Sequence, residues 1–281
     1  MKKFTFRSLC MLILFTFLCS CFSFGSVAAI STTESLEIEG TTLVKYHGLG
    51  SKVVVPNGIT EIADGAFSGC GRITSITLPE GLLSIGDSAF YRCNGLTQLS
   101  LPSTVSEIGK SAFAGCDKLT TITLPNRVTV VSDSLFSGCS KLVKVTLSPN
   151  TTKVGSDAFW GCSSLTEISF PDTVVELGKE IFSGCSSLQT FTFPSQTTVI
   201  PNSMFSSCSS LSKVEIPTSV KEIGSYAFSD CTALTHLDLP DTISTIGNSA
   251  FTGSRNLESI SLPDSLVALS SGVFSYCTSL N

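Results

Sequence analysis

The stretch Leu96–Lys118, LTQLSLPSTVSEIGKSAFAGCDK, decides the fold, because its pattern returns every 23 residues along most of the chain. Phenylalanine keeps this step ten times without a gap. These residues are Phe67, Phe90, Phe113, Phe136, Phe159, Phe182, Phe205, Phe228, Phe251 and Phe274. Cysteine keeps the step nine times, with Ser254 in the one missing place. These residues are Cys70, Cys93, Cys116, Cys139, Cys162, Cys185, Cys208, Cys231 and Cys277. Such regularity indicates stacked units, because each short unit must bury its apolar side chains against its neighbours.

The repeated unit divides into a strand and a return. The segment L-x-x-I-x-L alternates in polarity and ends at proline, which cannot continue a hydrogen-bonded ladder, so it predicts a short strand. The following I-G-x-x-A-F-x-G-C segment contains glycines and predicts a tight return. We therefore predict a repeat solenoid of 23-residue units, with a parallel β-sheet on one face and short helical or irregular turns on the other.

The whole motif L-x-x-I-x-L-P-x-x-V-x-x-I-G-x-x-A-F-x-G-C resembles the leucine-rich repeat of BspA-like, or Treponema-type, proteins. The resemblance covers residues 53–281, which we interpret as the solenoid, open or truncated at its C-terminus. The segment Leu43–Gly48 leading into Val53–Pro56 resembles the strand and glycine-rich stretch that precede the first repeat in this family. Residues 30–52 are accordingly predicted to form an N-terminal cap.

The first 29 residues have the pattern of a secretory signal peptide. Lys2, Lys3 and Arg7 precede the apolar run 9–24, and small side chains follow at 27–29. This run is shorter than the roughly 20 residues that a spanning helix needs, although an uncleaved anchor is the alternative interpretation. A second alternative is a lipoprotein signal, because residues 18–21 resemble a lipobox that would place a lipid anchor at Cys21. We expect no transmembrane segment after signal removal.

Composition argues against several classes of function. The chain has 17 Lys and Arg against 22 Asp and Glu, so it lacks the excess of positive charge that nucleic acid binding requires. It has only two histidines, and the repeated part contains no C-x-x-C. We therefore predict no metal site and no cofactor. The repeated cysteines could approach closely enough for disulfides between successive units, but their common register favours buried free thiols.

Strand alternation places two rows of mostly Ser and Thr side chains on the outer surface of the predicted sheet. The first row is Ser75, Gln98, Thr121, Lys144, Glu167, Thr190, Lys213, His236 and Ser259. The second row is Thr77, Ser100, Thr123, Thr146, Ser169, Thr192, Glu215, Asp238 and Ser261. The tentative ligand-binding residues are Lys213, Glu215, His236, Asp238, Lys144, Glu167 and Gln98. An open sheet offers no pocket for a nucleophile, so we predict no catalytic residues and no enzyme.

Two aromatic residues interrupt another repeated position. Tyr91 and Trp160 follow the repeated phenylalanine directly, where other units carry small residues such as Ser or Ala. They are either exposed anchors for a partner on the turn side or rings that fill local gaps in the packing. The pattern leaves both interpretations open.

These observations favour an exported, non-enzymatic binding and adhesion protein, secreted or held at the cell surface, that presents its Ser/Thr-rich sheet to extracellular proteins or glycans. The family resemblance implies adhesion to host matrix proteins such as fibronectin and fibrinogen. The alternative is a structural or self-assembling module of the cell envelope, whose copies associate through the open end of the solenoid.

Overall fold

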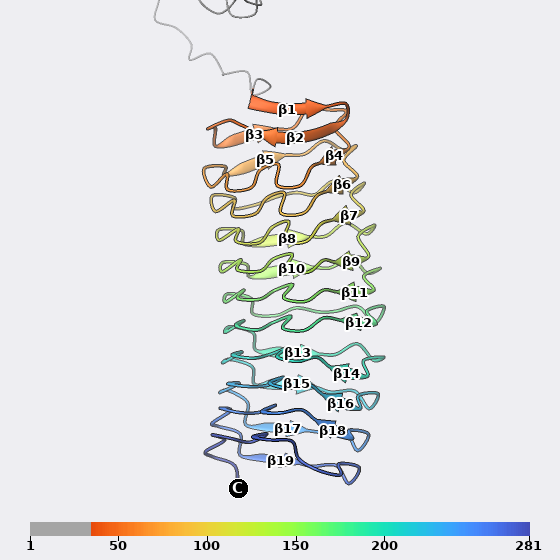
Figure 1. The fold of residues 1–281 in the computed structure, drawn as a ribbon, viewed down its shortest axis with the longest axis vertical. Coiled ribbons are helices and arrows are strands. Elements are labelled where there is room, and N and C mark those ends of the chain that lie inside the picture. Colours follow the sequence, from red (N-terminus) through yellow and green to blue (C-terminus); the bar gives the residue numbers. More distant parts are fainter. Residues whose placement is uncertain (1–34) are drawn as a thin grey trace, which may run out of the picture. The chain divides into compact units, whose positions relative to one another are not determined.

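The computed structural model describes residues 35–281, so the predicted signal peptide (1–29) and the predicted lipid anchor at Cys21 lie outside the described residues. Residues 35–281 lie within one compact unit, in which the 23-residue repeats stack as successive coils (Figure 1). The predicted repeat solenoid is confirmed. A search of the described residues for a helix able to cross a membrane finds none.

One side of the coils carries the predicted parallel strands, and we call this side the first face. Its strands are β3 (Lys52–Val54), β5 (Ser75–Thr77), β8 (Thr121–Thr123), β10 (Lys144–Thr146), β13 (Thr190–Thr192), β15 (Lys213–Glu215), β17 (His236–Asp238) and β19 (Ser259–Ser261). They pair in parallel as β3–β5, β8–β10, β13–β15 and β17–β19, each residue opposite the one 23 positions away. The ladder is interrupted: Gln98 forms a single bridge to Thr121, and residues 167–169 form no strand.

A second row of strands, which the repeat did not lead us to predict, runs along another side of the coils (Figure 1). We call this side the second face. Its strands are β4 (Glu61–Ile62), β6 (Ser84–Ile85), β7 (Glu107–Ile108), β9 (Val130–Val131), β11 (Lys153–Val154), β12 (Glu176–Leu177), β14 (Val199–Ile200), β16 (Glu222–Ile223) and β18 (Thr245–Ile246). A glycine often comes directly after a strand of this face, as Gly109 comes after β7. At Gly109 a Cβ would lie 2.5 Å from the backbone nitrogen of Asp87, so the chain needs glycine for this close approach between coils.

A hairpin precedes the first coil. Strands β1 (Leu36–Glu39) and β2 (Thr42–Tyr46) pair antiparallel, and β2 pairs in parallel with β4 of the second face. The Tyr46 ring lies 5.5 Å from the ring of Phe67 and covers that end of the phenylalanine row. Gly48 makes room for it, because a Cβ there would come within 2.5 Å of the tyrosine ring. The boundaries predicted for a cap at 30–52 remain a prediction.

The third side, which we call the turn side, holds the return segment of each repeat. The sequence predicted either short helical or irregular turns here. Residues 35–281 contain no α-helix, so the turns are irregular. Backbone hydrogen bonds still connect successive coils here, for example from Phe67 N to Ala89 O at 2.7 Å and from Phe90 N to Ala112 O at 2.8 Å. Neighbouring coils are therefore hydrogen-bonded on the turn side as well as through the paired strands of the two faces.

The ten phenylalanines form one continuous stack through the interior. Successive ring centroids lie 5.1 to 5.7 Å apart, with interplanar angles of 4° to 18°. All except Phe274 are fully buried. The offset, nearly parallel arrangement adds a favourable aromatic interaction to the burial of apolar surface.

The repeated cysteines are free thiols, and most of them form hydrogen bonds to the backbone of the stacked phenylalanines. Each thiol from Cys93 to Cys277 lies 3.1–3.2 Å from the carbonyl oxygen of a phenylalanine 26 residues earlier, to which it donates a hydrogen bond. Ser254, in the place of the missing cysteine, donates through Oγ to Phe228 O at 2.8 Å. Burial raises the pKa of the Cys139 and Cys185 thiols to about 12, so they stay protonated as donors at neutral pH.

Replacing Phe159 by alanine should lower the free energy of unfolding by about 3–5 kcal/mol, because it opens a cavity between two stacked rings. Urea unfolding followed by circular dichroism measures the loss. Phe274→Ala is the matched control: this ring is only partly buried and stacks on Phe251 alone, so its loss should cost less. Equal costs at the two positions would contradict the stack as the source of stability.

Buried thiols should resist alkylation until the chain unfolds. At pH 8 iodoacetamide reacts with thiolate, and burial keeps the seven thiols from Cys93 to Cys231 protonated and covered. Mass spectrometry of digested protein should find label at Cys70 and Cys277 first, because both are partly exposed. All nine should be labelled in urea. Rapid labelling of Cys162 in the folded protein would show that this register is wrong.

Candidate functional site

The first face presents both predicted rows of polar side chains to solvent. Every residue of the two rows is exposed, including all seven of the tentative ligand-binding residues. The buried residues between them, such as Val145 and Leu237, point into the core. The predicted alternation is therefore confirmed, while the binding role of these residues stays a prediction.

The face is not flat, because two hollows lie where the strand ladder is interrupted. The first has a volume of about 630 Å³ and covers the coil with residues 167–169. The second has a volume of about 640 Å³ and covers the coil with residues 98–100, where Gln98 lines it together with Thr121 and Asn126. Both are wide open to solvent. Tentative residues Lys144 and Glu167 line the first hollow.

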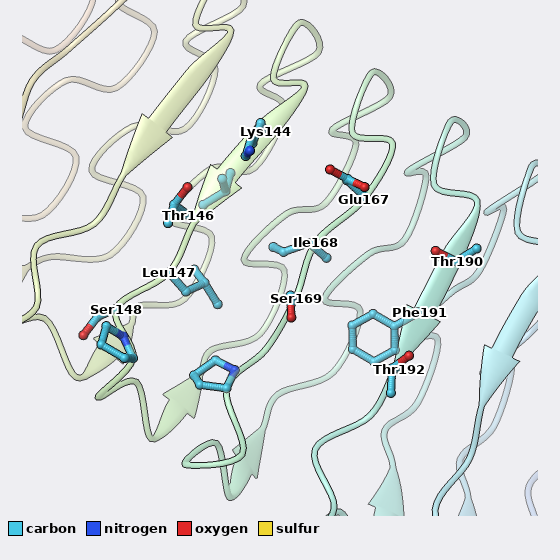
Figure 2. Close-up of a pocket in the computed structure, with 13 residues that line it drawn as sticks. Lys144, Thr146, Leu147, Ser148, Glu167, Ile168, Ser169, Thr190, Phe191 and Thr192 are labelled. Carbon is cyan, nitrogen blue, oxygen red and sulfur yellow. The ribbon is translucent and has the colours of Figure 1, made fainter.

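The first hollow has an apolar floor and polar rows of side chains. Figure 2 shows one row formed by Lys144, Glu167 and Thr190 on successive coils. A parallel row carries Thr146, Ser169 and Thr192. The floor comes from residues that are at most 9% exposed, namely Val145, Leu147, Ile168 and Phe191. A surface of this kind offers hydrogen-bonding hydroxyls and two opposite charges above a patch of apolar contact.

A cluster of rings holds that floor in place. Phe191 meets Phe170 edge to face at 5.3 Å and Phe193 at 4.9 Å. Phe191 also lies 5.3 Å from both Phe182 and Phe205 of the central stack. Aromatic pairs in these geometries favour one packing arrangement, so the floor is connected rigidly to the core.

Pro149 and Pro171 border the first hollow at the end of the strands. Pro149 occupies its place because the proline of this repeat is shifted by one residue, and Ser148 takes the usual position. The Ser148 hydroxyl donates to the carbonyl oxygen of Asn126 at 3.0 Å, which secures the altered turn. Thr151 stands in a column of apolar residues and is buried, with its hydroxyl donating to Ser148 O at 2.8 Å.

The other four tentative residues lie outside both hollows. Lys213 Nζ and Glu215 Oε1 form an ion pair at 2.8 Å on one strand, and this contact lowers the pKa of Glu215. His236 Nδ1 lies 3.1 Å from the hydroxyl of its neighbour Thr235. No hydrogen bond or ion pair in the described part of the chain joins Lys213 or Glu215 to His236 or Asp238. The sequence placed the four side by side, but the structure gives them no common hydrogen-bonded site.

The electrostatics of the first face are those of an exposed surface. Lys213 and Glu215 are more than half exposed, so their ion pair contributes little to stability. Lys144 and Glu167 have no ionic partner within residues 35–281, which leaves both charges available to a ligand. Across the same residues, no three His, Cys, Asp or Glu side chains gather where they could hold a metal ion.

Sequence reasoning did not identify the hollows or the residues beneath them. The repeat at 165–171, LTEISFP, alternates as regularly as its neighbours, so nothing in its pattern predicts the loss of the strand. The usable signals were the shifted Pro149 and the phenylalanines at 170, 191 and 193, where most other repeats carry Leu, Ile or Val. On the turn side the sequence pointed to Tyr91 and Trp160. It did not identify the residues that line a hollow together with them, such as Asn94 and Asp117.

Comparison with known proteins finds solved structures that are similar to the chain. No curated protein matches the chain. A solved leucine-rich cell surface protein from Faecalibacterium prausnitzii A2-165 is 26% identical, with a TM-score of 0.49, covering 88% of this chain and 90% of that chain. A leucine-rich repeat protein from Bacteroides ovatus ATCC 8483 is 25% identical, with a TM-score of 0.42, covering 85% and 81%. The T. pallidum leucine-rich repeat protein is 25% identical, with a TM-score of 0.46, covering 82% and 89%.

The family model described as BspA type leucine rich repeat region matches residues 46–166 and 152–281 with six copies. Together these two ranges cover well over half of the chain and the whole of the stacked coils. The protein therefore belongs to the BspA-type leucine-rich repeat family.

Proposed function

We propose that the protein is an exported, non-enzymatic binding protein that uses the first face to adhere to extracellular proteins or glycans. The observation that carries this proposal is the hollow above residues 167–169, where exposed polar rows flank an apolar floor. Family membership supports a binding role, because leucine-rich repeats use their extended sheet surfaces for interaction. The pattern of residues 1–29 supports export.

The open geometry favours binding over catalysis. The two hollows are broad and solvated, so a nucleophile or general base placed there would lack the dry, enclosed surroundings that catalysis needs. The ionisable side chains of the first hollow are Lys144 and Glu167, both at its exposed rim. Such a surface recognises a partner through hydroxyl hydrogen bonds and rim charges, which steer association and set specificity.

Host matrix proteins are the ligands that the family resemblance implies, and fibronectin and fibrinogen are the first to test. A first face of about nine coils at sheet spacing is on the order of 40 Å long, enough for an interface of ordinary size. Because its charges are few and of both signs, we expect affinity to depend only weakly on salt.

Binding to immobilised fibronectin, fibrinogen and a glycan panel should identify the ligand, and two sets of variants should locate it. The double variant Lys144→Ala/Glu167→Ala removes the charges of the first hollow. The quadruple variant Lys213→Ala/Glu215→Ala/His236→Ala/Asp238→Ala removes the second group of tentative residues. We expect at least one set to weaken binding about tenfold or more, which corresponds to about 1.4 kcal/mol.

The matched control is Lys153→Ala/Glu176→Ala on the second face. It removes one ion pair of 3.0 Å, leaves the net charge unchanged and does not touch the first face. Its affinity should equal that of the unaltered protein. Unchanged binding in both first-face sets, or an equal loss in the control, would refute the first face as the binding surface.

Self-assembly is the second candidate function, and one observation favours it. In the last coil Leu262, Val267 and Leu269 are 43%, 94% and 49% exposed, and Phe274 is the one phenylalanine of the stack that is not fully buried. If copies join through this coil, sedimentation velocity at rising concentration should show dimers or larger species. The variant Val267→Asp/Leu269→Asp should return the protein to a monomer. A monomer at every concentration would exclude this alternative.

A further inference from the structure

A third hollow lies on the turn side, away from both sheet faces, with a volume of about 450 Å³. Tyr91 and Trp160 line it from coils three steps apart in the same register. Between them, the intervening coils carry only the small residues Ala114 and Ser137 at that position. The two rings therefore lie at opposite ends of a trough, with no large side chain at this repeated position between them.

Backbone hydrogen bonds fix the distance between the two ends. Arg92 N donates to Ala114 O at 2.8 Å, Gly115 N to Ser137 O at 2.7 Å, and Gly138 N to Trp160 O at 2.6 Å. This ladder crosses each coil boundary between the two rings, so their Cα atoms lie about 14 Å apart at sheet-like spacing. The backbone of the site is therefore ordered before any ligand arrives, which lowers the entropy lost on binding.

Glycine forms the floor of the trough. Gly115 and Gly138 have φ of +69° and +74°, a conformation that favours glycine, and the missing side chains leave the trough open. Arg92 stands in the same register with φ of +54°. Its stem lies against Gly115, where a Cβ would come 3.0 Å from Arg92 Cγ, and its guanidinium lies 5.1 Å from the centre of the Tyr91 ring.

Polar groups that face the trough have unused hydrogen-bonding capacity. The Asn94 amide nitrogen donates to the carbonyl oxygens of Gly115 at 2.6 Å and Arg92 at 3.0 Å, which fixes this side chain in the lining of the trough. Within residues 35–281 the Tyr91 hydroxyl, the Trp160 indole N–H and the Asp117 carboxylate have no hydrogen-bond partner. The trough thus combines free donors, free acceptors and two aromatic surfaces, and Trp160 is 47% exposed.

We propose that this trough binds a short, neutral oligosaccharide, with pyranose rings packed against Tyr91 and Trp160. A pyranose presents C–H groups on its faces, which pack on aromatic rings, and hydroxyls at its edge, which both donate and accept. The Asp117 carboxylate accepts hydrogen bonds, and sugar hydroxyls can donate them. A proline-rich peptide fits less well, because proline has no N–H to donate and the glycine floor offers little apolar surface. Arg92 and Asp117 carry opposite charges, which matches a ligand without net charge.

Trp160 is the one tryptophan of the chain, so its fluorescence reports directly on this site. The probes are chitotriose, cellotriose and maltotriose, titrated up to about 10 mM into the purified protein. We expect at least one of them to change the emission saturably. Tyr91→Ala should raise the Kd of that trisaccharide about tenfold or more, because it removes one of the two stacking surfaces.

Tyr226→Ala is the matched control, because Tyr226 is an exposed tyrosine outside the trough. It should leave the Kd unchanged. Calorimetry with Trp160→Phe and Trp160→Ala adds a readout that does not need fluorescence, and the phenylalanine variant should retain more affinity than alanine. Thermal unfolding of each variant confirms that it is folded.

Saturable binding that Tyr91→Ala abolishes would establish the site. No response to any of the three trisaccharides, or equal affinity in Tyr91→Ala and the unaltered protein, would overturn it. The first-face variants Lys144→Ala/Glu167→Ala should bind the trisaccharide normally. The two proposals therefore fail independently: loss of matrix binding concerns the first face alone, and loss of trisaccharide binding concerns the trough alone.

Discussion

Stacking of one phenylalanine per coil is the interaction on which the rest of the structure depends. Each ring rests on the ring of the next coil at 5.1 to 5.7 Å, and each phenylalanine carbonyl from Phe67 to Phe251 also accepts a hydrogen bond from the thiol or hydroxyl 26 residues further on. The ring fixes how one coil sits on the next, and the Sγ–H or Oγ–H group satisfies a buried carbonyl that would otherwise lack a second partner. This pairing explains why serine is tolerated at position 254: its hydroxyl donates the same bond.

Because the interior repeats, the repeats differ from one another mainly at the outward positions. Any two residues 23 apart become neighbours on adjacent coils, whatever their type. Lys144 beside Glu167 and Tyr91 in line with Trp160 are therefore arrangements that single substitutions can create without disturbing the core. The same rule limits the chemistry: no described interior position holds a charged side chain, and the buried polar residues are Ser and Thr, such as Thr151, whose hydroxyl donates to Ser148 O. Recognition at the surface is the function that such a scaffold can vary most easily.

The sequence predicted those features of the fold that depend on strict repetition. Phe159, Cys162 and the alternation around Val145 all follow from the period, because a buried register must repeat when the units stack. The second face was missed because strands of two residues, such as Glu107–Ile108, are too short to show alternation and were interpreted as part of the turn. The interruptions at 98–100 and 167–169 were missed for another reason. Their sequences alternate normally, and the loss of pairing is a property of several stacked coils together.

The candidate sites were also predicted only in part from the sequence, because they depend on several coils together. The register placed Lys144 and Glu167 on one surface, but the hollow between them also needs Phe191 from beneath and Pro149 from the side, which no repeat pattern brings together. Likewise the register aligned Tyr91 with Trp160, yet whether such rings pack inward or border a trough depends on Ala114, Ser137 and the glycines between them. A hollow forms only where substitutions in several repeats lie next to one another, and the folded structure is needed to show which of them do.

Rigidity matters for both of the proposed binding surfaces. An open, polar face recovers little free energy per contact, because each hydrogen bond formed with a ligand replaces one with water. Each site lies on its own side of a single rigid column, so less of that free energy is lost in ordering the protein when a ligand binds. The phenylalanine stack supplies that rigidity. The repetition of the interior is thus also what lets separate, weakly binding surfaces keep their geometry in the absence of a ligand.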